Sequence, residues 1–406
     1  MPLSAILGPP LGGKGWTMNV GQLIFSQFIE LLPRHEFAKC VARYRGNYRA
    51  RRFRCWDQLL VMAFAQLTFR ESLRDIETCL RAMPQKLYHA GIRSTVARAT
   101  LADANESRDW RIWADFAAVL IAEARRLHAD ESFGVRLKAN TYIFDTTTID
   151  LCLTLFPWAQ FRRHKSAVKV HTLMDLRGNI PCFISITAGS VHEINILDEL
   201  PLEAGSYYVM DRGFVDFQRL HRFTRSQAFF IVRGKENLDF RVRESRTVDF
   251  PPGLKADQII RLRGPKTRRL YPELLRRVSY TAPQTGVHFT FLTNNFELAA
   301  STITRLYHCR WEVELFFKWI KQYLRIKAFF GTSENAVKTQ LWIAISVYIL
   351  VAIMKKQLGL SQTMGEILQI LSVTLFEKAP ILQVFAEAKM TIEQLDDANS
   401  LPLLEI

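Results

Sequence analysis

The sequence predicts a mixed α/β protein, in which a sheet core with a β-rich insertion lies between two helical regions. Apolar residues recur at three- and four-residue spacing across residues 18–136 and 333–406, which is typical of helices that bury one face. Residues 137–233 instead alternate short β-branched and aromatic runs with helical stretches. Residues 234–294 mix short β-type runs with Lys, Arg, Pro and Gly, which indicates a β-rich insertion.

Charge and composition narrow the possible partners. The 406 residues include 54 Lys or Arg and 39 Asp or Glu, so the formal net charge is +15. This excess favours a polyanion, either nucleic acid or an anionic membrane surface. The longest apolar run, residues 341–354, is shorter than the roughly 20 residues of a spanning helix and fits a buried core helix, so we expect no membrane contact. Six scattered cysteines without C-x-x-C spacing indicate reduced cytosolic thiols.

The N-terminal helical region, residues 18–136, contains an arginine cluster. Arg49, Arg51, Arg52 and Arg54 are interleaved with aromatic residues. A solvated surface without any function would also explain such a cluster. The aromatic interleaving and the overall charge instead favour contacts with DNA phosphates. We therefore expect a DNA-binding region here, preceded by a disordered extension over residues 1–17.

The core is predicted to contain three strands, a helix, a strand, a helix and a last strand. A turn at residues 177–179 joins the second and third strands into a hairpin. This order fits a sheet that begins antiparallel and continues parallel through crossovers. The predicted strands are 142–144, 168–173, 181–187, 207–210 and 228–232, with helical stretches at 194–200 and 215–223.

Two aspartates stand where predicted strands end. Asp145 follows the first strand and Asp211 follows the fourth. A strand exit holds a catalytic or metal-binding group firmly and leaves it open to substrate. Each residue also has a purely structural explanation, because Asp145 can form an Asx turn and Asp211 can cap the turn at Gly213.

The longest helix candidate, residues 302–324, presents a polar face. At about 100° per residue, Tyr307, Arg310, Glu314 and Lys321 fall within a sector of about 60°. A salt bridge between Arg310 and Glu314 would explain this face without any function.

A third carboxylate from this helix makes a chemical hypothesis possible. Asp145, Asp211 and Glu314 offer hard oxygen ligands on three separate elements, which suits Mg²⁺. Two such ions can activate the nucleophile and stabilise the leaving oxygen when a DNA phosphodiester is broken.

The spacing of the four polar residues on the predicted helix 302–324 resembles the Y-(2)-R-(3)-E-(6)-K signature of the IS-four family of bacterial insertion-sequence DDE transposases. Its members here are Tyr307, Arg310, Glu314 and Lys321. The segments Asp145-Thr146-Thr147 and Asp211-Arg212-Gly213-Phe214 are similar to the two aspartate segments of that family. The resemblance covers about residues 18–390.

This resemblance implies a cut-and-paste DNA transposase with an RNase H-like core. The core would comprise residues 137–233 and, after the insertion over 234–294, residues 295–332 with the Glu helix; residues 333–406 would form a helical C-terminal region. Asp145, Asp211 and Glu314 would be the catalytic residues and would bind two Mg²⁺ (or Mn²⁺) ions. The resemblance further implies DNA contacts by Tyr307, Arg310 and Lys321, double-stranded DNA partners (element ends and target), a homodimer in the DNA complex, no small-molecule substrate, and a cytoplasmic, nucleoid-associated bacterial protein.

Other interpretations stay open at this point. The chain could be a metal-dependent nuclease without strand transfer, or a non-catalytic repressor derived from a transposase. Some relatives form a DNA hairpin and stack a flipped base on a tryptophan of the insertion, but no Trp lies between residues 159 and 310. Phe240, Tyr271 or Tyr280 would have to replace it. Lys169 and His171 face either DNA or the sheet surface.

Overall fold

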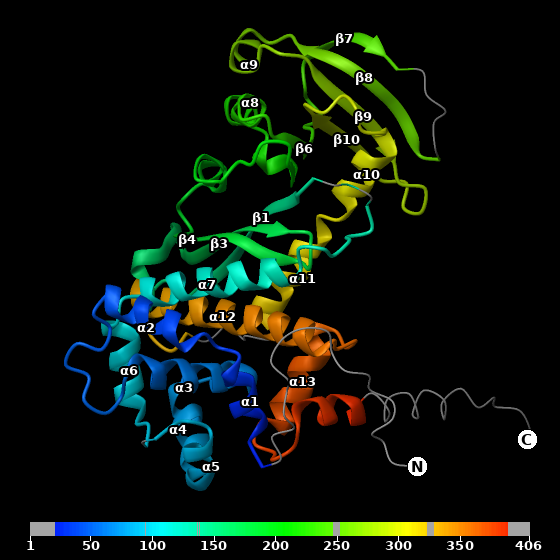
Figure 1. Cartoon of the computed structure of the whole chain (residues 1–406). Coiled ribbons are helices and arrows are strands. Elements are labelled where there is room, and N and C mark those ends of the chain that lie inside the picture. Colours follow the sequence, from blue (N-terminus) through cyan, green and yellow to red (C-terminus); the bar gives the residue numbers. More distant parts are fainter. Residues whose placement is uncertain are drawn as a thin grey trace, which may run out of the picture.

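The computed structural model of the chain contains one mixed sheet with helices on both faces (Figure 1). It describes residues 21–388 apart from 94, 136, 138, 247–251 and 323–328. The predicted extension over 1–17 and the end of the predicted C-terminal region, residues 389–406, lie outside the described residues. The described strands form a ten-stranded sheet in the order β2-β3-β1-β5-β6-β10-β9-β8-β7, with β4 also paired to β3.

The first half of the sheet has RNase H-like topology. Strands β1 (Thr141–Leu151), β3 (Lys165–Asp175) and β4 (Ile180–Ala188) are antiparallel, whereas β5 (Tyr207–Met210) pairs parallel to β1 and β6 (Phe229–Arg233) pairs parallel to β5. The predicted antiparallel start and parallel continuation are therefore confirmed. The elements between them are η2 (Pro157–Ala159), β2 (Gln160–Arg162), η3 (Glu193–Asp198), η4 (Arg212–Phe214) and α8 (Phe217–Arg225). The helical stretch expected at 194–200 is only a 3₁₀ turn, η3.

The β-rich segment continues the core sheet instead of forming a separate one. Strand β10 (His288–Thr293) pairs antiparallel with β6, and β9 (Leu275–Thr281) pairs with β10. Backbone groups at the open edge of β6 are satisfied in this way. The remaining elements of this segment are β7 (Phe240–Ser245), β8 (Leu254–Leu262) and α9 (Pro265–Leu270).

The two sheet faces have separate cores, because successive side chains of a strand point to opposite faces. Ile143 belongs to a large core that includes Trp113 of α7 (Arg111–Leu127) and Ile345 of α12 (Glu334–Leu358). Phe144 belongs to the other core, which includes Phe223 of α8. Residues of β1 with odd numbers, Asp145 among them, thus lie on the face covered by α7, α12 and α11 (Trp311–Gln322).

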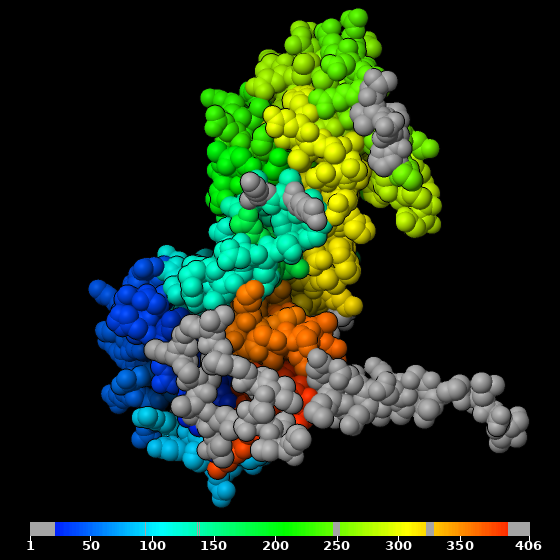
Figure 2. Space-filling view, turned by 45° about the vertical axis from the view of Figure 1, so that its right-hand side comes forward, coloured from blue at the N-terminus to red at the C-terminus, as the bar shows by residue number. Residues whose placement is uncertain are grey.

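The remaining helices pack below α7 and α12, and Figure 2 shows them as a lobe distinct from the sheet and its insertion. Among the described residues, α12 is the one helix long and apolar enough to cross a membrane, but 94% of its most apolar window is buried within the protein. It is a core helix, as the short apolar run over residues 341–354 predicted. The helices of this lobe are α1 (Ile24–Glu30), α2 (Arg34–Arg43), α3 (Cys55–Leu67), α4 (Leu73–Arg81), α5 (Pro84–His89), α6 (Arg98–Ser107) and α13 (Met364–Thr374).

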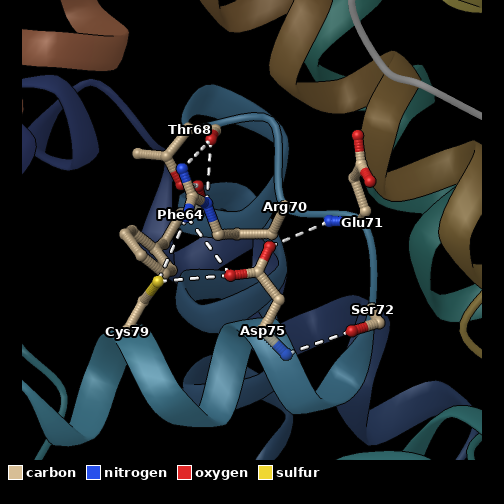
Figure 3. A network of polar contacts seen from close by, with 7 residues as sticks. All are labelled: Phe64, Thr68, Arg70, Glu71, Ser72, Asp75 and Cys79. Atoms are coloured by element: carbon tan, nitrogen blue, oxygen red, sulfur yellow. Dashed lines mark hydrogen bonds and ion pairs between the residues drawn. The ribbon is translucent and has the colours of Figure 1, made fainter.

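A polar network fixes the corner between α3 and α4 (Figure 3). The Arg70 guanidinium donates to the Thr68 carbonyl (2.6 Å), to Asp75 Oδ1 (3.3 Å) and to Cys79 Sγ (3.1 Å). The Ser72 hydroxyl caps α4 by accepting from the Asp75 backbone N–H (3.1 Å). One arginine therefore ties the end of α3 to the first two turns of α4.

The single helix expected over residues 302–324 is wrong, because two helices meet at Cys309 and Arg310. Helix α10 (Ala300–His308) ends there and α11 begins. The N–H of Arg310 bonds to the carbonyl of Tyr307 (3.0 Å), and the N–H of Glu312 bonds to that of Cys309 (3.0 Å). These bonds span three residues instead of four, so the chain tightens and turns between the two helices.

Candidate active site

Asp145 and Asp211 lie next to each other on two neighbouring segments in the interior of the sheet, β1 and the end of β5. Phe144 of β1 is paired in parallel register with Met210 of β5. Asp211 follows the end of β5. The expectation that Asp145 also stands at a strand end is wrong, because Asp145 lies within β1, whose pairing with β3 continues to Leu151. Each aspartate is the residue after one member of the Phe144–Met210 pair, and neighbouring strands are about 4.8 Å apart. The register thus brings together two residues that are 66 positions apart in the sequence.

The segment around the α10–α11 break joins these aspartates to Glu314. The Tyr307 hydroxyl donates to Asp211 Oδ1 (2.9 Å). The Arg310 guanidinium donates through Nη1 to Asp145 Oδ2 and through Nη2 to Glu314 Oε1, both at 2.6 Å. The Arg310 guanidinium also lies 5.8 Å from the Tyr307 ring centroid. Five of the six predicted core site residues therefore form one connected constellation.

Lys321 is the sixth, and it lies apart from the acids. Its side chain is exposed at the end of α11. Asp150, near the end of β1, is the carboxylate that acts on its charge. Lys321 therefore lies on α11 near the far end of β1. Among the described residues, it has no contact with the carboxylates of Asp145, Asp211 and Glu314.

The Asp145 carboxyl has an unusual environment. Its side chain is only 17% exposed. The pKa of Asp145 is raised to about 6, chiefly by burial and also by the neighbouring Asp211 and Glu314 carboxylates, against the opposing effects of the Thr146 N–H and Arg310. Perturbed acids of this kind concentrate at functional sites.

The three carboxylates suit a hard divalent cation as ligands, although the Arg310 side chain lies between two of them. Three carboxylates carry more negative charge than Arg310 compensates, and all are oxygen ligands. In the described part of the chain, no three acidic, histidine or cysteine side chains already converge as metal ligands. Arg310 lies between Asp145 and Glu314, so the acids could share a cation once its guanidinium turned aside.

Two secondary candidates lie beneath the site instead of on its surface. Both ring nitrogens of His171 have hydroxyl partners, Thr146 Oγ1 at 2.8 Å and Thr187 Oγ1 at 2.9 Å, and burial lowers the pKa of His171 to about 4. The buried Lys169 ammonium donates to the Val191 carbonyl (2.8 Å). The idea that these two side chains face DNA is therefore wrong, because the sheet surface around them is covered.

The arginines of the N-terminal region lie away from the acids, in the lobe below α7 and α12. Arg49, Arg51 and Arg52 line an open cavity of about 940 Å³ together with Tyr48. Arg54 lines an adjoining groove. The structure therefore gathers these four residues on one surface, but not beside the carboxylates.

Of the suggested stacking residues, Tyr271 is unsuitable. Its ring is 1% exposed and its hydroxyl bonds to Thr224 (2.8 Å). The Arg277 guanidinium covers Phe240 at 5.3 Å, and Tyr280 is half-buried.

Sequence reasoning missed Arg233, which lies at the end of β6. Its guanidinium lies 4.9 Å from the ring centroid of Phe289, and its charge acts on the Tyr307 hydroxyl. The available signal was its position at the end of the strand that follows Asp211 in the sequence.

Comparison with known proteins identifies the family. Residues 136–350 match the "Transposase DDE domain" family, and residues 20–93 match a domain of unknown function, DUF4372. The putative transposase y4zB of Sinorhizobium fredii is 31% identical over 257 residues, which are 62% of this chain and 70% of that protein. The probable transposase of insertion sequence element IS5377 from Geobacillus stearothermophilus is 30% identical over 51% of this chain and 55% of its own length.

A more distant relative matches over a longer stretch. The putative transposase of insertion sequence element IS4SA from Synechocystis is 22% identical over 84% of this chain and 95% of its own length. The piggyBac transposase in a synaptic complex with hairpin DNA aligns with 94% of this chain and 84% of its own, at 12% identity and a TM-score of 0.44. The family match covers more than half of the chain, and it includes both aspartates and Glu314. The chain therefore belongs to the DDE transposases of bacterial insertion sequences.

Proposed function

We propose that this transposase cuts and joins DNA with Asp145, Asp211 and Glu314 as its catalytic acids, which bind two Mg²⁺ (or Mn²⁺) ions. The observation that carries this proposal is the connected constellation itself. Parallel register sets Asp145 beside Asp211, and Arg310 joins Asp145 to Glu314. When bound, the ions would activate the attacking oxygen and stabilise the leaving oxygen of a phosphodiester.

Arg310 and Tyr307 would position the DNA. Arg310 Nε is buried without a hydrogen-bond partner among the described residues, so its present contacts leave one donor unused. A phosphate accepts two parallel N–H bonds from a guanidinium and would satisfy it better. Tyr307, which orients Asp211, would remain beside the same backbone, and Lys321 would hold a phosphate farther along.

The other parts of the proposal concern assembly and location. The N-terminal arginines Arg49, Arg51, Arg52 and Arg54 would contact the phosphates of the element end, because they are exposed around one concave surface. Two element ends have to be held together for transposition, so we propose a homodimer in the DNA complex. The protein would act in the bacterial cytoplasm, associated with the nucleoid, without membrane or small-molecule partners.

Nicking of a duplex from the terminal repeat of the element tests this proposal. Wild-type protein should nick the duplex with Mg²⁺ and not with EDTA, and Asp145→Ala should be inactive. Glu199→Gln, which removes an exposed carboxylate, is a matched control and should retain activity. Strand transfer to a second duplex separates a transposase from a nuclease, and equal nicking by Asp145→Ala would refute the assignment.

A further inference from the structure

Asp257 of β8 and Arg276 of β9 form a buried ion pair inside the insertion. Each side chain is 2% exposed, and the pair is joined by two bonds, from Arg276 Nε to Asp257 Oδ1 (2.8 Å) and from Nη2 to Oδ2 (2.6 Å). Replacing such a pair by apolar residues is often neutral or stabilising, because both charges have lost their water. Stability alone therefore does not explain the pair, and the other contacts of Arg276 are informative.

The Arg276 guanidinium also binds the connector between β10 and α10, residues 294–299. Its Nη1 donates to the carbonyls of Leu298 (2.5 Å) and Asn295 (3.4 Å). A guanidinium can serve a carboxylate and two carbonyls at once because its five N–H donors lie in a fixed plane, whereas a lysine ammonium cannot reproduce this geometry. Arg276 thus fixes the position of the connector relative to β8 and β9.

A second arginine of the insertion holds the same connector. Arg246, which follows β7, donates through Nη1 to the carbonyl of Phe296 (2.7 Å). Its backbone N–H is bonded to the carbonyl of Asp257 (2.9 Å), so both arginines are anchored on one residue of β8. We name Asp257, Arg246 and Arg276 the α10 clamp, because together they bind the residues that lead into α10.

The catalytic core holds the connector from its other side. The Asn295 side chain accepts from the backbone N–H groups of Glu297 (3.1 Å) and Leu298 (2.8 Å). Its Nδ2 donates to the Tyr207 hydroxyl of β5 (3.3 Å), and β5 is the strand that Asp211 follows. The connector therefore lies between the α10 clamp of the insertion and the strand that carries Asp211.

Helix α10 relates the connector to the acids. It begins at Ala300, and Tyr307 lies about 10 Å farther along it, at 1.5 Å per residue. The Tyr307 ring packs against Phe291 at 4.7 Å, and its hydroxyl donates to Asp211 Oδ1 (2.9 Å). Figure 1 shows α10 leading from the strands of the insertion to α11. A displacement of the start of α10 would therefore move the Tyr307 hydroxyl relative to Asp211.

We propose that the α10 clamp positions the active site: by fixing the start of α10, it holds the Tyr307 hydroxyl on Asp211. This inference rests on the proposed function, in which Asp211 is a catalytic acid. Arg276 is buried within the protein, so its role does not involve contact with DNA. Asp257, Arg246 and Arg276 are then positioning residues, through which the insertion sets the rate of cleavage. A displacement of about 1 Å at a reacting group can slow an enzyme about a hundredfold.

The first measurement observes Tyr307 directly and requires no activity. 3-Fluorotyrosine is incorporated at position 307, and its ¹⁹F resonance is recorded in EDTA. Arg276→Lys keeps a positive charge beside Asp257 but loses the planar set of donors, so the resonance should shift or broaden. Arg277→Lys is the matched control and should leave it unchanged, because Arg277 is the next residue of β9, points to the other face and donates to Gln258 (2.9 Å).

The second measurement is a double-mutant cycle on single-turnover nicking of a saturating terminal-repeat duplex. Arg276→Lys should lower the rate at least about tenfold, whereas duplex binding should stay within about twofold. In a Tyr307→Phe background, which lacks the hydroxyl, the same substitution should lower the rate less than about twofold. A general loss of stability would not depend on the Tyr307 hydroxyl in this way.

An unchanged fluorine resonance in Arg276→Lys would overturn the inference, and so would an equal rate loss with and without the Tyr307 hydroxyl. If Arg276→Lys fails to fold, Arg246→Ala replaces it, because this half-buried side chain contributes only the contact to Phe296. It should produce the same two changes on a smaller scale, and their absence would also overturn the inference. If wild-type protein failed to nick DNA, the proposed function would fail while the fluorine resonance still tested the clamp.

Discussion

Replacing Asp145 with Asn should stabilise the protein at neutral pH while it abolishes DNA cleavage. Asp145 is buried, and burial together with two neighbouring carboxylates raises its pKa to about 6 from 3.8. A shift of about 2 units corresponds to about 3 kcal/mol between the protonated and the charged carboxyl. The charged form therefore destabilises the folded state, and a neutral amide of the same shape removes that cost.

The sign of the pH dependence follows from the raised pKa. Below about pH 4 the carboxyl is protonated in both the folded and the unfolded state, so it costs nothing. The free energy of unfolding falls as pH rises from about 4 to about 6, and the full cost of about 3 kcal/mol applies above that range. Asn keeps an oxygen acceptor for Arg310, so Asp145→Asn should gain up to about 3 kcal/mol at pH 7 and little at pH 4.

Urea unfolding at both pH values, in EDTA and in Mg²⁺, measures this effect. Mg²⁺ should stabilise wild-type protein by binding only the folded state, so the advantage of the variant should shrink. Glu199→Gln serves as a control and should show neither effect. An Asp145→Asn protein that is destabilised to the same extent at pH 7 and pH 4 would show that the carboxylate is structural, and would refute this reasoning.

Three further predictions concern individual side chains. Arg310→Gln should lower the nicking rate at least about a hundredfold. Arg310→Lys should be equally impaired, because an ammonium cannot form two parallel bonds to a phosphate. Near-normal nicking by the lysine variant would contradict this. Arg276→Met should lower the free energy of unfolding by about 3–5 kcal/mol, because Asp257 would stay buried without its partner, whereas Arg263→Met, at an exposed ion pair, should have little effect in the same urea titration. His171 has its pKa lowered to about 4, so stability should fall as pH drops from about 6.5 towards 4; His171→Asn should remove this pH dependence, and an unchanged profile would contradict the assignment.

Local patterns were enough to predict the strands of the core. Runs such as 142–144 and 207–210 are short, apolar and rich in β-branched or aromatic residues, and each lies in a strand of the structure, although β1 extends to Leu151. The position of Asp211 directly after a strand is equally local, whereas the continuation of β1 beyond Asp145 depends on its pairing with β3. The placement of Asp145 beside Asp211 follows from the RNase H-like order, in which these two strands are parallel neighbours.

Features that depend on distant contacts were not predictable. The α10–α11 break occurs where Tyr307 contacts Asp211 and Arg310 contacts Asp145. No glycine or proline in residues 302–324 predicts it. Likewise, the alternation of Lys169 and His171 identifies a common face of the strand. It does not say whether that face is covered by the rest of the protein.

The extent of the sheet was also beyond local reasoning. Continuity between the core and the insertion depends on the pairing of β10 with β6, which lie about 60 residues apart.

A structure of the protein with its terminal-repeat duplex and Mn²⁺, with the ions located by anomalous scattering, tests the catalytic assignment most directly. We expect two metal peaks about 3.5–4 Å apart, both ligated by carboxylate oxygens of Asp145, Asp211 and Glu314, with Arg310 turned to a phosphate. Peaks bound elsewhere, or carboxylates still bridged by Arg310 in the loaded complex, would contradict it.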